Sequence, residues 1–379
     1  MMETTKKNTL QYLPHELIIQ ILLRLPVKYL IRFKCVCKLW FSLISDSHFA
    51  NSHFQITAIK HTPKIMFISN SAPHETLSID FESSPLHYDS SSVSLNPNCM
   101  PPFQSYPHIE IKGSCRGFLL LHCYDQHWIY DIYLWNPSTG FHKKIPLSPF
   151  SSKLEDNFFY GFGYDHSTDD YLLVSMSYDD SDSCVTLLSH LGFFSLKTNT
   201  WKEIEDTHDY YIISLEDVKA GLLFNGTLHW FGYGHDDLEE AVIIAFDLRE
   251  RKLLDIHLPD DFYYILDDCG LWVSGEFLSV WAMDDNIVEI WVMKEYQVHS
   301  SWTKTIVLPL DVIPNEYFTP LRSTKSGDII GIASLNGLGK YNDKGQLLEY
   351  HSYCNDPYGS QMALYIESLL SLPPDSEQA

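Results

Sequence analysis

Paired carboxylates are the residues of this sequence whose type and spacing could do chemistry. Acidic residues stand next to each other in four turn-rich segments: Asp169 and Asp170, Asp179 and Asp180, Asp236 and Asp237, and Asp284 and Asp285. Two carboxyl groups at a fixed separation could hydrolyse a glycosidic bond. Nothing in the sequence fixes such a separation, and acidic residues in turns are usually only hydrated. The pairs therefore predict no catalytic site.

Three short motifs resemble cofactor or metal sites, and each lacks a required residue. "GFGYDH" has His166 where a dinucleotide loop needs its third glycine. "GLGKY" has Tyr341 where a phosphate loop needs Ser or Thr, and Ser334 takes the place of its first glycine. "HELII" ends in Ile19 where a zinc-protease helix has its second histidine. The eight cysteines include no CxxC pair. We therefore expect no catalytic, metal-binding or cofactor-binding residues, and no cofactor.

The charge divides the chain into two unequal parts. The 379 residues, 45% of them hydrophobic, suit one large domain or a large domain with a small companion. Residues 1–60 hold eight Lys and Arg against three acidic residues, whereas residues 61–379 hold 18 against 46. This asymmetry predicts two modules with different partners. The acidic part repels phosphate backbones, so we expect no nucleic acid partner.

The sequence carries no signal for a membrane. Residues 1–12 are polar, and no small-residue cleavage site follows the apolar run behind them. No stretch reaches 18 uninterrupted apolar residues. We therefore expect a cytoplasmic or nuclear protein, or one found in both places, without a membrane partner.

Apolar residues at helical spacing fill the first part of the chain. A first helix is predicted where Leu13, Leu17, Ile21 and Leu25 recur every four residues. Pro14 stands at its first turn, where proline is tolerated. Pro26 ends it. A second helical run contains Leu30, Phe33, Val36, Trp40, Leu43 and Ile44.

These two helices carry more apolar surface than they can cover themselves. The cover is either the rest of the chain or another protein. The cations Lys28, Arg32, Lys34 and Lys38 also allow a helix-turn-helix that contacts DNA phosphates. Their side chains do not line one helix face, and the acidic part of the chain opposes DNA, so this alternative is the weaker one.

The segment "LPHELIIQILLRLPVKYLIRFKCVCKLWFSLISDSHF" resembles an F-box of the plant type. In that family the segment binds the Skp-type adaptor of a cullin–RING (SCF) ubiquitin ligase. The resemblance implies that the first part of the adaptor-binding surface consists of Leu13, Pro14, Leu17, Ile21, Leu25 and Pro26. It implies that the second part, together with the internal packing, consists of Leu30, Phe33, Val36, Trp40, Leu43 and Ile44.

A β-hairpin unit repeats through the remainder of the chain. It occurs as "YLWNPSTGFHKKIPL", "GFFSLKTNTWKEIE", "IIAFDLRERKLLDIHLP", "EIWVMKEYQVHSSWTKTIVLP" and "GLGKYNDKGQLLEY", with turns near residues 136, 197, 247, 294 and 342. A period near 50 residues is typical of propeller blades, and the chain has room for about six. A two-layer sandwich stays possible. We expect the spaces between blades to be filled by Trp135, Trp201, Trp230, Trp291 and Trp302.

The repeats also carry a resemblance to a family. The motifs "GSCRGFLLL", "LWNPSTGFHKKIP", "GFGYDHSTDDYLLV", "FFSLKTNTWKEI", "NGTLHWFGY", "IIAFDL" and "EIWVMKEYQVHSSWTK" resemble the plant F-box-associated interaction domain. They imply a protein of the F-box/kelch-repeat or S-locus F-box type, whose second domain binds a target protein.

Together these features predict an α+β multidomain protein. A small all-α F-box bundle is followed by a mainly β, propeller-like domain of about six blades. We expect a flexible N-terminus at 1–9, the F-box at 10–53, the F-box-associated domain at 54–370 and a flexible tail at 371–379.

The predicted function is that of a non-catalytic, substrate-recognition subunit of an SCF-type ubiquitin ligase. Its expected partners are a Skp-type adaptor, a cullin and a RING protein reached through that adaptor, and an unidentified protein target, for which the acidic part of the chain suggests a basic surface. The alternative is a propeller lectin or glycan-processing protein with an N-terminal protein-docking segment.

Overall fold

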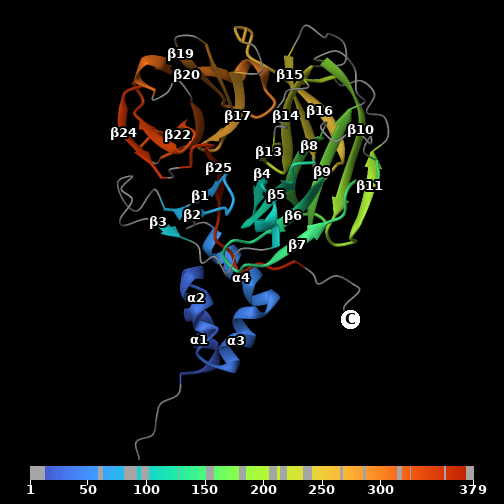
Figure 1. Ribbon diagram of the computed structural model, residues 1–379, viewed down its shortest axis with the longest axis vertical. Helices are drawn as coiled ribbons and strands as arrows, with labels where there is room; N and C mark the ends of the chain where they lie inside the picture. Colours follow the sequence, from blue (N-terminus) through green and yellow to red (C-terminus); the bar gives the residue numbers. More distant parts are fainter. Residues whose placement is uncertain are drawn as a thin grey trace, which may run out of the picture.

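The computed structural model shows a helical part next to a ring of β-sheets (Figure 1). It describes residues 13–58, 63–80, 92–94, 102–127, 129–150, 158–178, 185–204, 211–213, 220–233, 241–264, 268–284, 287–313, 318–324, 326–353 and 356–372. The predicted flexible segment 1–9 lies outside these residues, as does most of the predicted tail, from residue 373 onward.

Four α-helices form the helical domain, residues 13–58. They are α1 (His15–Leu22), α2 (Val27–Phe33), α3 (Lys38–Ser45) and α4 (Ser47–Ala58). Pro14 and Pro26 are the N-cap residues of α1 and α2. The sequence predicts a helix start at Pro14, but α1 ends at Leu22, before the predicted end at Pro26. The prediction of one second helical run is wrong, because the chain turns between α2 and α3 and Cys37 is fully extended. Residues 34–37, between α2 and α3, contain neither Gly nor Pro, so no residue type in the sequence signals the break.

The predicted domain boundary between residues 53 and 54 lies inside α4. This helix buries Phe49, Ala50, His53, Phe54 and Thr57, which recur at intervals of three and four residues. A buried stripe of this kind holds the whole helix in place, so the helical domain continues to Ala58. The first strand begins at Lys64.

Six blades form the ring, and we number them in chain order (Figure 1). The described strands make five hydrogen-bonded sheets, because blades 3 and 4 are joined into one sheet of nine strands. Blade 1 contains β1 (Lys64–Ser69), β2 (Thr76–Ile79), β3 (Ser92–Ser94) and β25 (Ser360–Tyr365). Blade 2 contains β4 (His108–Cys115), β5 (Phe118–Tyr124), β6 (Tyr130–Trp135) and β7 (His142–Ile145). Blade 3 contains β8 (Phe158–Asp165), β9 (Asp170–Tyr178), β10 (Val185–Ser195) and β11 (Thr200–Ile204).

The other three blades follow the same plan. Blade 4 contains β13 (Leu222–Phe224), β14 (Thr227–Tyr233), β15 (Ala241–Asp247) and β16 (Lys252–His257), and β12 (Tyr211–Ile213) joins it to blade 3. Blade 5 contains β17 (Cys269–Ser274), β18 (Phe277–Met283), β19 (Ile287–Met293) and β20 (Trp302–Pro309). Blade 6 contains β21 (Thr319–Ser323), β22 (Ile329–Ser334), β23 (Gly337–Tyr341) and β24 (Leu347–Ser352). Short 3₁₀-helices lie at Pro102–Ser105, His299–Ser301 and Leu310–Val312.

The two ends of the β chain close the ring. β25 pairs antiparallel with β1, with Lys64 opposite Tyr365 and Ser69 opposite Ser360. The last strand therefore becomes the innermost strand of the first blade. This pairing confirms the six-bladed propeller and removes the sandwich alternative.

The predicted hairpin units are the two outer strands of blades 2 to 6. Trp135, Trp230 and Trp291 are buried in the cores between neighbouring blades, as predicted. Trp201 and Trp302 occupy equivalent positions in two outer strands. Their indole N–H groups donate to Pro146 O at 2.8 Å and His257 O at 3.0 Å, each at the end of the preceding blade. The repeated tryptophan therefore joins blades by hydrogen bonds as well as by packing.

Candidate functional site

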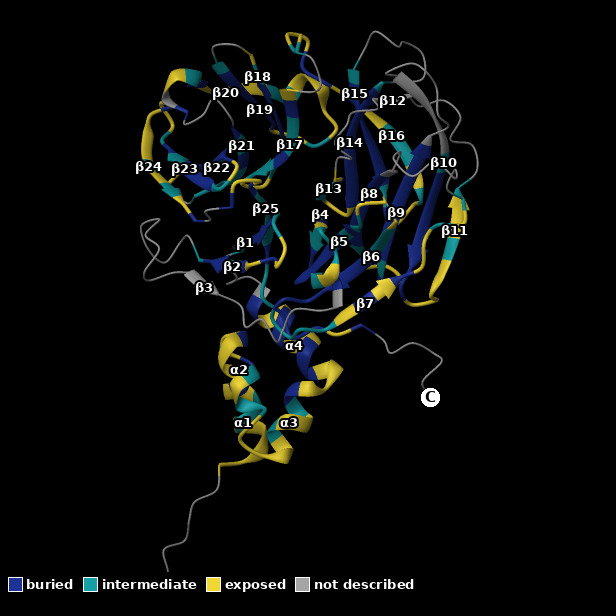
Figure 2. Ribbon diagram, viewed as in Figure 1, coloured by how far each residue is buried: buried dark blue, intermediate teal, exposed yellow. Residues whose placement is uncertain are grey.

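The helical domain extends away from the propeller and leaves apolar side chains in solvent (Figure 2). Of the twelve residues that the sequence predicts for adaptor binding, Leu30 and Ile44 are buried. Four others are half-buried against the same core: Leu25, Phe33, Trp40 and Leu43. Six are exposed: Leu13, Pro14, Leu17, Ile21, Pro26 and Val36. Leu30 and Ile44 thus belong to the internal packing and not to the outer surface.

Helix α1 is apolar on two sides, and only one side is covered. Leu22 and Leu23 are buried in the core. Leu13, Leu17 and Ile21, which are spaced by four residues, keep 59%, 50% and 51% of their surface exposed. Leu17 and Ile21 lie on one face of α1, because residues four apart share a helix face. Leu13 precedes the helix, which begins at His15, and we call the three exposed residues the apolar stripe. Exposed apolar patches of this kind are typical of protein-interaction sites.

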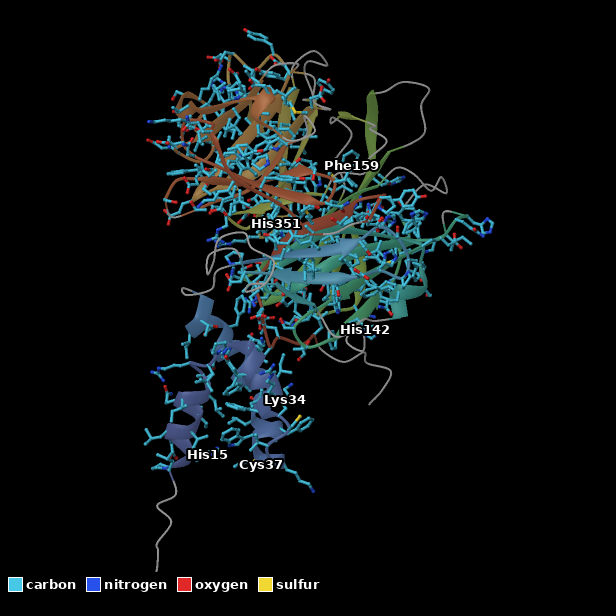
Figure 3. All side chains as sticks on the ribbon, turned by 60° about the vertical axis from the view of Figure 1, so that its left-hand side comes forward. His15, Lys34, Cys37, His142, Phe159 and His351 are labelled. Atoms are coloured by element: carbon cyan, nitrogen blue, oxygen red, sulfur yellow. The ribbon has the colours of Figure 1, made fainter. Side chains whose placement is uncertain are left out.

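The exposed stripe lies at the end of the molecule that is farthest from the propeller. Figure 3 shows His15, at the start of α1, and Cys37, just before α3, together at this end. Val36 and Leu39 flank Cys37 and are also exposed. We call the set Leu13, Leu17, Ile21, Val36 and Leu39 the helical apolar surface.

Sequence reasoning missed four exposed apolar residues of the helical domain: Tyr29, Leu39, Phe41 and Ile56. The prediction took Trp40 from this part of α3 and did not separate the outer surface of the second helical run from its internal packing. Because α3 starts anew at Lys38, its exposed face runs through Leu39 instead. A signal was available, since Leu39, Trp40 and Phe41 are consecutive and cannot all face one core.

A polar contact holds α4 against the end of α1. Nε2 of His53 lies 2.8 Å from Leu25 O. Burial lowers the pKa of His53, with the hydrogen bond to Leu25 acting in the opposite direction. The rings of Phe33 and Trp40 pack 5.3 Å apart between α2 and α3. These contacts fix the shape of the helical domain beneath its exposed surface.

Arg116 joins α4 to the propeller. It occupies the tight turn between β4 and β5, and its guanidinium lies 3.8 Å from the ring centroid of Tyr164 and 4.8 Å from that of Phe54. Its Nη2 also lies 3.4 Å from Asn51 Oδ1. One continuous core extends from Leu22 of the helical domain to Phe118 of blade 2. The two domains therefore share their packing.

The segment after β25 lines this junction. Leu369, Leu370 and Leu372 belong to the shared core. The buried side-chain amide of Asn136 donates to Ser368 O at 3.1 Å and to Leu370 O at 2.9 Å. Asn136 begins the "NPSTG" turn, in which Gly140 has a positive φ of 75°. The motif thus makes a turn, as expected, and also anchors the C-terminal segment.

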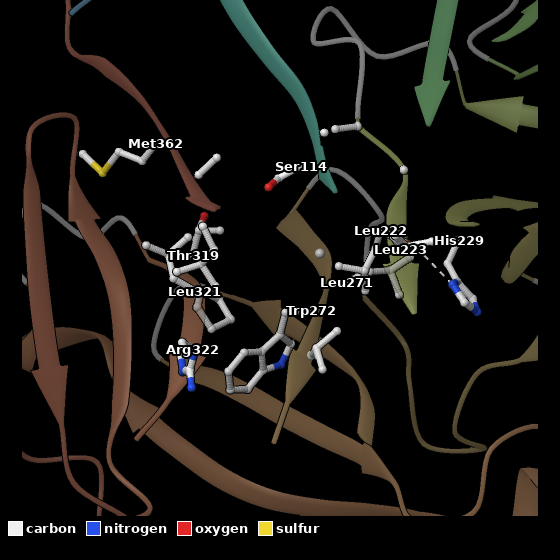
Figure 4. Close-up of a pocket in the computed structure, with 18 of the residues that line it drawn as sticks. Ser114, Leu222, Leu223, His229, Leu271, Trp272, Thr319, Leu321, Arg322 and Met362 are labelled. Carbon is white, nitrogen blue, oxygen red and sulfur yellow. Dashed lines mark hydrogen bonds between the residues drawn. The ribbon is translucent and has the colours of Figure 1, made fainter. Parts of the chain in front are cut away.

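The centre of the ring holds a cavity of about 690 Å³ (Figure 4). Its lining comes from the innermost strand of every blade, and it includes Ser114, Leu271, Thr319, Arg322 and Met362. None of the lining residues is Asp or Glu. His229 also contributes, and burial lowers its pKa to about 4, so it is neutral near pH 7. Among the described residues, the lining of the cavity thus holds no pair of carboxyl groups of the kind that glycoside hydrolysis requires.

The adjacent aspartates of the turn-rich segments have structural roles where the structure describes them. Asp170 is buried and accepts hydrogen bonds from Ser195 Oγ and the Lys197 N–H. Asp169 accepts one from the Tyr164 hydroxyl. Asp284 accepts one from the Ile287 N–H. The remaining members lie outside the described residues: Asp179, Asp180, Asp236, Asp237 and Asp285.

The described part of the chain offers neither a metal site nor a membrane-spanning helix. These residues contain no group of three or more His, Cys, Asp or Glu side chains placed to hold a metal ion. They also contain no helix with the length and apolar character needed to cross a membrane.

Comparison with known proteins identifies both domains. The family described as "F-box domain" matches residues 10–51, and the family described as "F-box associated beta propeller domain" matches residues 65–326. The chain is 28% identical to the F-box/kelch-repeat protein At3g23880 of Arabidopsis thaliana, over 81% of this chain and 82% of that protein. It is 29% identical to the F-box protein CPR1 of Arabidopsis thaliana, over 83% of this chain and 77% of that protein.

The solved structures with a similar fold do not extend the family assignment. TolB from Acinetobacter baumannii superposes with a TM-score of 0.43 at 10% identity, over 84% of this chain and 72% of that one. A similarity of this size carries no conclusion. The two family matches cover residues 10–51 and 65–326, and the second alone covers more than half of the chain. The chain therefore belongs to the plant F-box proteins that carry an F-box associated β-propeller domain.

Proposed function

We propose that the chain is a substrate-recognition subunit of an SCF-type ubiquitin ligase. The observation that carries this proposal is the exposed stripe of Leu13, Leu17 and Ile21, which lies inside the matched F-box and far from the propeller. Its partner is a Skp-type adaptor, and a cullin and a RING protein join through that adaptor. Burial of the stripe against the adaptor supplies the binding energy. The complex acts in the cytoplasm, the nucleus or both.

The subunit contributes geometry and no catalysis of its own. The continuous core between the helical domain and the propeller supports this part of the proposal. Two domains that share a core keep a fixed orientation, so a target bound to the propeller stays at a defined place relative to the ligase. Holding two reactants in place raises the rate of transfer between them.

The target is a protein with a basic surface. Residues 61–379 carry 46 acidic and 18 basic residues, which favours a partner of opposite charge. Association with such a partner becomes slower and weaker as salt screens the charges.

Size-exclusion chromatography of the full-length chain with a purified Skp-type adaptor tests the proposal. We expect one complex for the natural chain, and two separate peaks for a chain that carries both Leu17→Asp and Pro26→Ala. Both residues are exposed, so the variant keeps its helical core. Equal complex formation by the natural chain and the variant would refute the adaptor assignment.

A further inference from the structure

The outer strands of the blades differ in whether their edges are protected against pairing with another chain. Among the described residues, the fourth strand of each blade pairs with a strand on one side only. Four of these strands carry an exposed lysine: Lys144 in β7, Lys202 in β11, Lys252 in β16 and Lys304 in β20. Lysine on an edge strand prevents pairing with other chains. β3 has only three residues, and a very short edge is also protected.

β24, the outer strand of blade 6, lacks both protections. Its six residues read "LLEYHS", with no lysine. Leu347, Leu348 and Tyr350 expose large apolar side chains along it, with 49% of Leu348 accessible. Figure 2 shows this strand as an exposed segment on the outside of the ring. Among the described residues, only β23 pairs with β24.

The apolar surface continues past the end of β24. The Tyr350 hydroxyl lies 2.9 Å from Oγ of Ser334, the residue before exposed Leu335. The backbone N–H of Ser360 donates to Leu335 O at 3.0 Å, so the loop before β25 lies against the same turn. That loop presents Tyr358, which is 75% exposed. We call Leu335, Leu347, Leu348, Tyr350 and Tyr358 the blade-6 patch.

We propose that the blade-6 patch binds an extended segment of the target protein, which adds to the propeller as a further strand beside β24. Open edge strands bind extended peptides through main-chain hydrogen bonds, and pockets for alternate side chains give specificity. Six residues offer an edge of about 20 Å, at roughly 3.3 Å per residue. This inference rests on the proposed function, because it names where the target binds.

Charge identifies the occupant as a segment that alternates apolar and basic residues. The one acidic or basic side chain of β24 apart from His351 is Glu349, and residues 61–379 are strongly acidic. A second copy of this chain would oppose Glu349 to an identical strand and bring together two bodies of net charge −23. Like charges directly opposite each other destabilise strand pairs. A basic strand from another protein meets no such repulsion.

The test uses the full-length chain and a fluorescent eight-residue peptide that alternates valine and lysine. We expect the peptide to bind, and to protect the backbone amides of Leu347–Ser352 from hydrogen exchange. A peptide that alternates valine and glutamate should not bind. The double variant Leu347→Lys and Leu348→Lys should bind the basic peptide at least tenfold more weakly.

A control of equal charge separates strand addition from general attraction to an acidic protein. Thr200→Lys with Thr303→Lys adds the same two charges to exposed positions on the outer strands β11 and β20. This control should change the affinity less than twofold. Equal weakening in both double variants, unprotected β24 amides or no binding to the natural chain would overturn the proposal. So would a dimer of the natural chain that the β24 variant dissociates in sedimentation velocity.

Adaptor binding is measured in the same proteins so that the two proposals can fail separately. The β24 variant should bind the Skp-type adaptor as the natural chain does, because the helical apolar surface is unchanged. If the adaptor binds and the peptide does not, the blade-6 assignment falls and the ligase role stands. If the peptide protects β24 and the adaptor fails to bind, the reverse holds.

Discussion

The side-chain amide of Asn136 donates a hydrogen bond of 2.9 Å to the carbonyl oxygen of Leu370, 234 residues later in the chain. The amide is buried in a turn of blade 2. The carbonyl lies in the segment that follows the closing strand β25 and packs into the core of the helical domain. Asn136 thus holds the segment that follows the closing strand in the core that the propeller shares with the helical domain.

Asn136→Ala should lower the free energy of unfolding by about 2–3 kcal/mol, because it leaves the buried carbonyls of Ser368 and Leu370 without their donor. Urea unfolding measures this. Asn342 begins the equivalent turn of blade 6 and bonds within that turn to Gln346. Asn342→Ala should therefore cost under about 1 kcal/mol. Similar losses in the two variants would contradict the anchoring role.

Arg116→Gln should loosen the junction between the domains. It removes a cation that lies over the rings of Phe54 and Tyr164, a contribution of about 1–2 kcal/mol. We expect faster hydrogen exchange throughout α4, with the strands of blade 5 unchanged. Arg249→Gln is the matched control, because Arg249 is highly exposed and forms its ion pair with the adjacent Glu250. Unchanged exchange in α4 would show that Arg116 does not hold it.

Trp201→Phe and Trp302→Phe should each destabilise the propeller by about 0.5–1.5 kcal/mol. Each change keeps an aromatic ring and removes one hydrogen bond to the preceding blade. Because the two residues occupy equivalent positions in blades that are not neighbours, their effects should add. Thermal unfolding of the two single variants and the double variant checks this, and a strongly non-additive result would argue against equivalent roles.

His229 should make the protein less stable as the pH falls from 6.5 toward 4. Burial lowers its pKa from 6.5 to about 4, so the unfolded chain gains a proton in this interval and the folded chain does not. Between pH 7 and pH 5 the natural chain should lose about 2 kcal/mol more than His229→Gln. Urea unfolding at the two pH values gives this difference. Identical losses in both proteins would place the pH sensitivity elsewhere.

The sequence predicts the outer hairpins well, because each is local. Trp201 and Trp302 each follow the turn of a predicted hairpin, and the structure places both at the start of a fourth strand. Blade 1 gave no such signal. Its two outer strands, β2 and β3, have only four and three residues, and its innermost strand, β25, comes from the far end of the chain.

Several features of the helical domain could not be predicted from the spacing of apolar residues. The spacing correctly predicts that Leu17 and Ile21 share one face of α1, but Leu13 and Leu25 lie outside this helix, which is shorter than predicted. Spacing alone also cannot tell whether that face is covered. The break between α2 and α3 was missed, because a helical period continues across it. The junction was also beyond prediction, since Phe54 and Arg116 meet only through tertiary packing.

The central claim is that the apolar stripe on α1 binds a Skp-type adaptor, and calorimetric titration of the full-length chain with the purified adaptor tests it most directly. The control is Ile129→Asp with Leu147→Asp, which places the same two charges on exposed apolar residues of the propeller. We predict a negative heat-capacity change for the natural chain, at least 100-fold weaker binding for Leu17→Asp with Ile21→Asp, and a change below twofold for the control. The claim would be contradicted by equal affinities of the natural chain and the Leu17→Asp, Ile21→Asp variant.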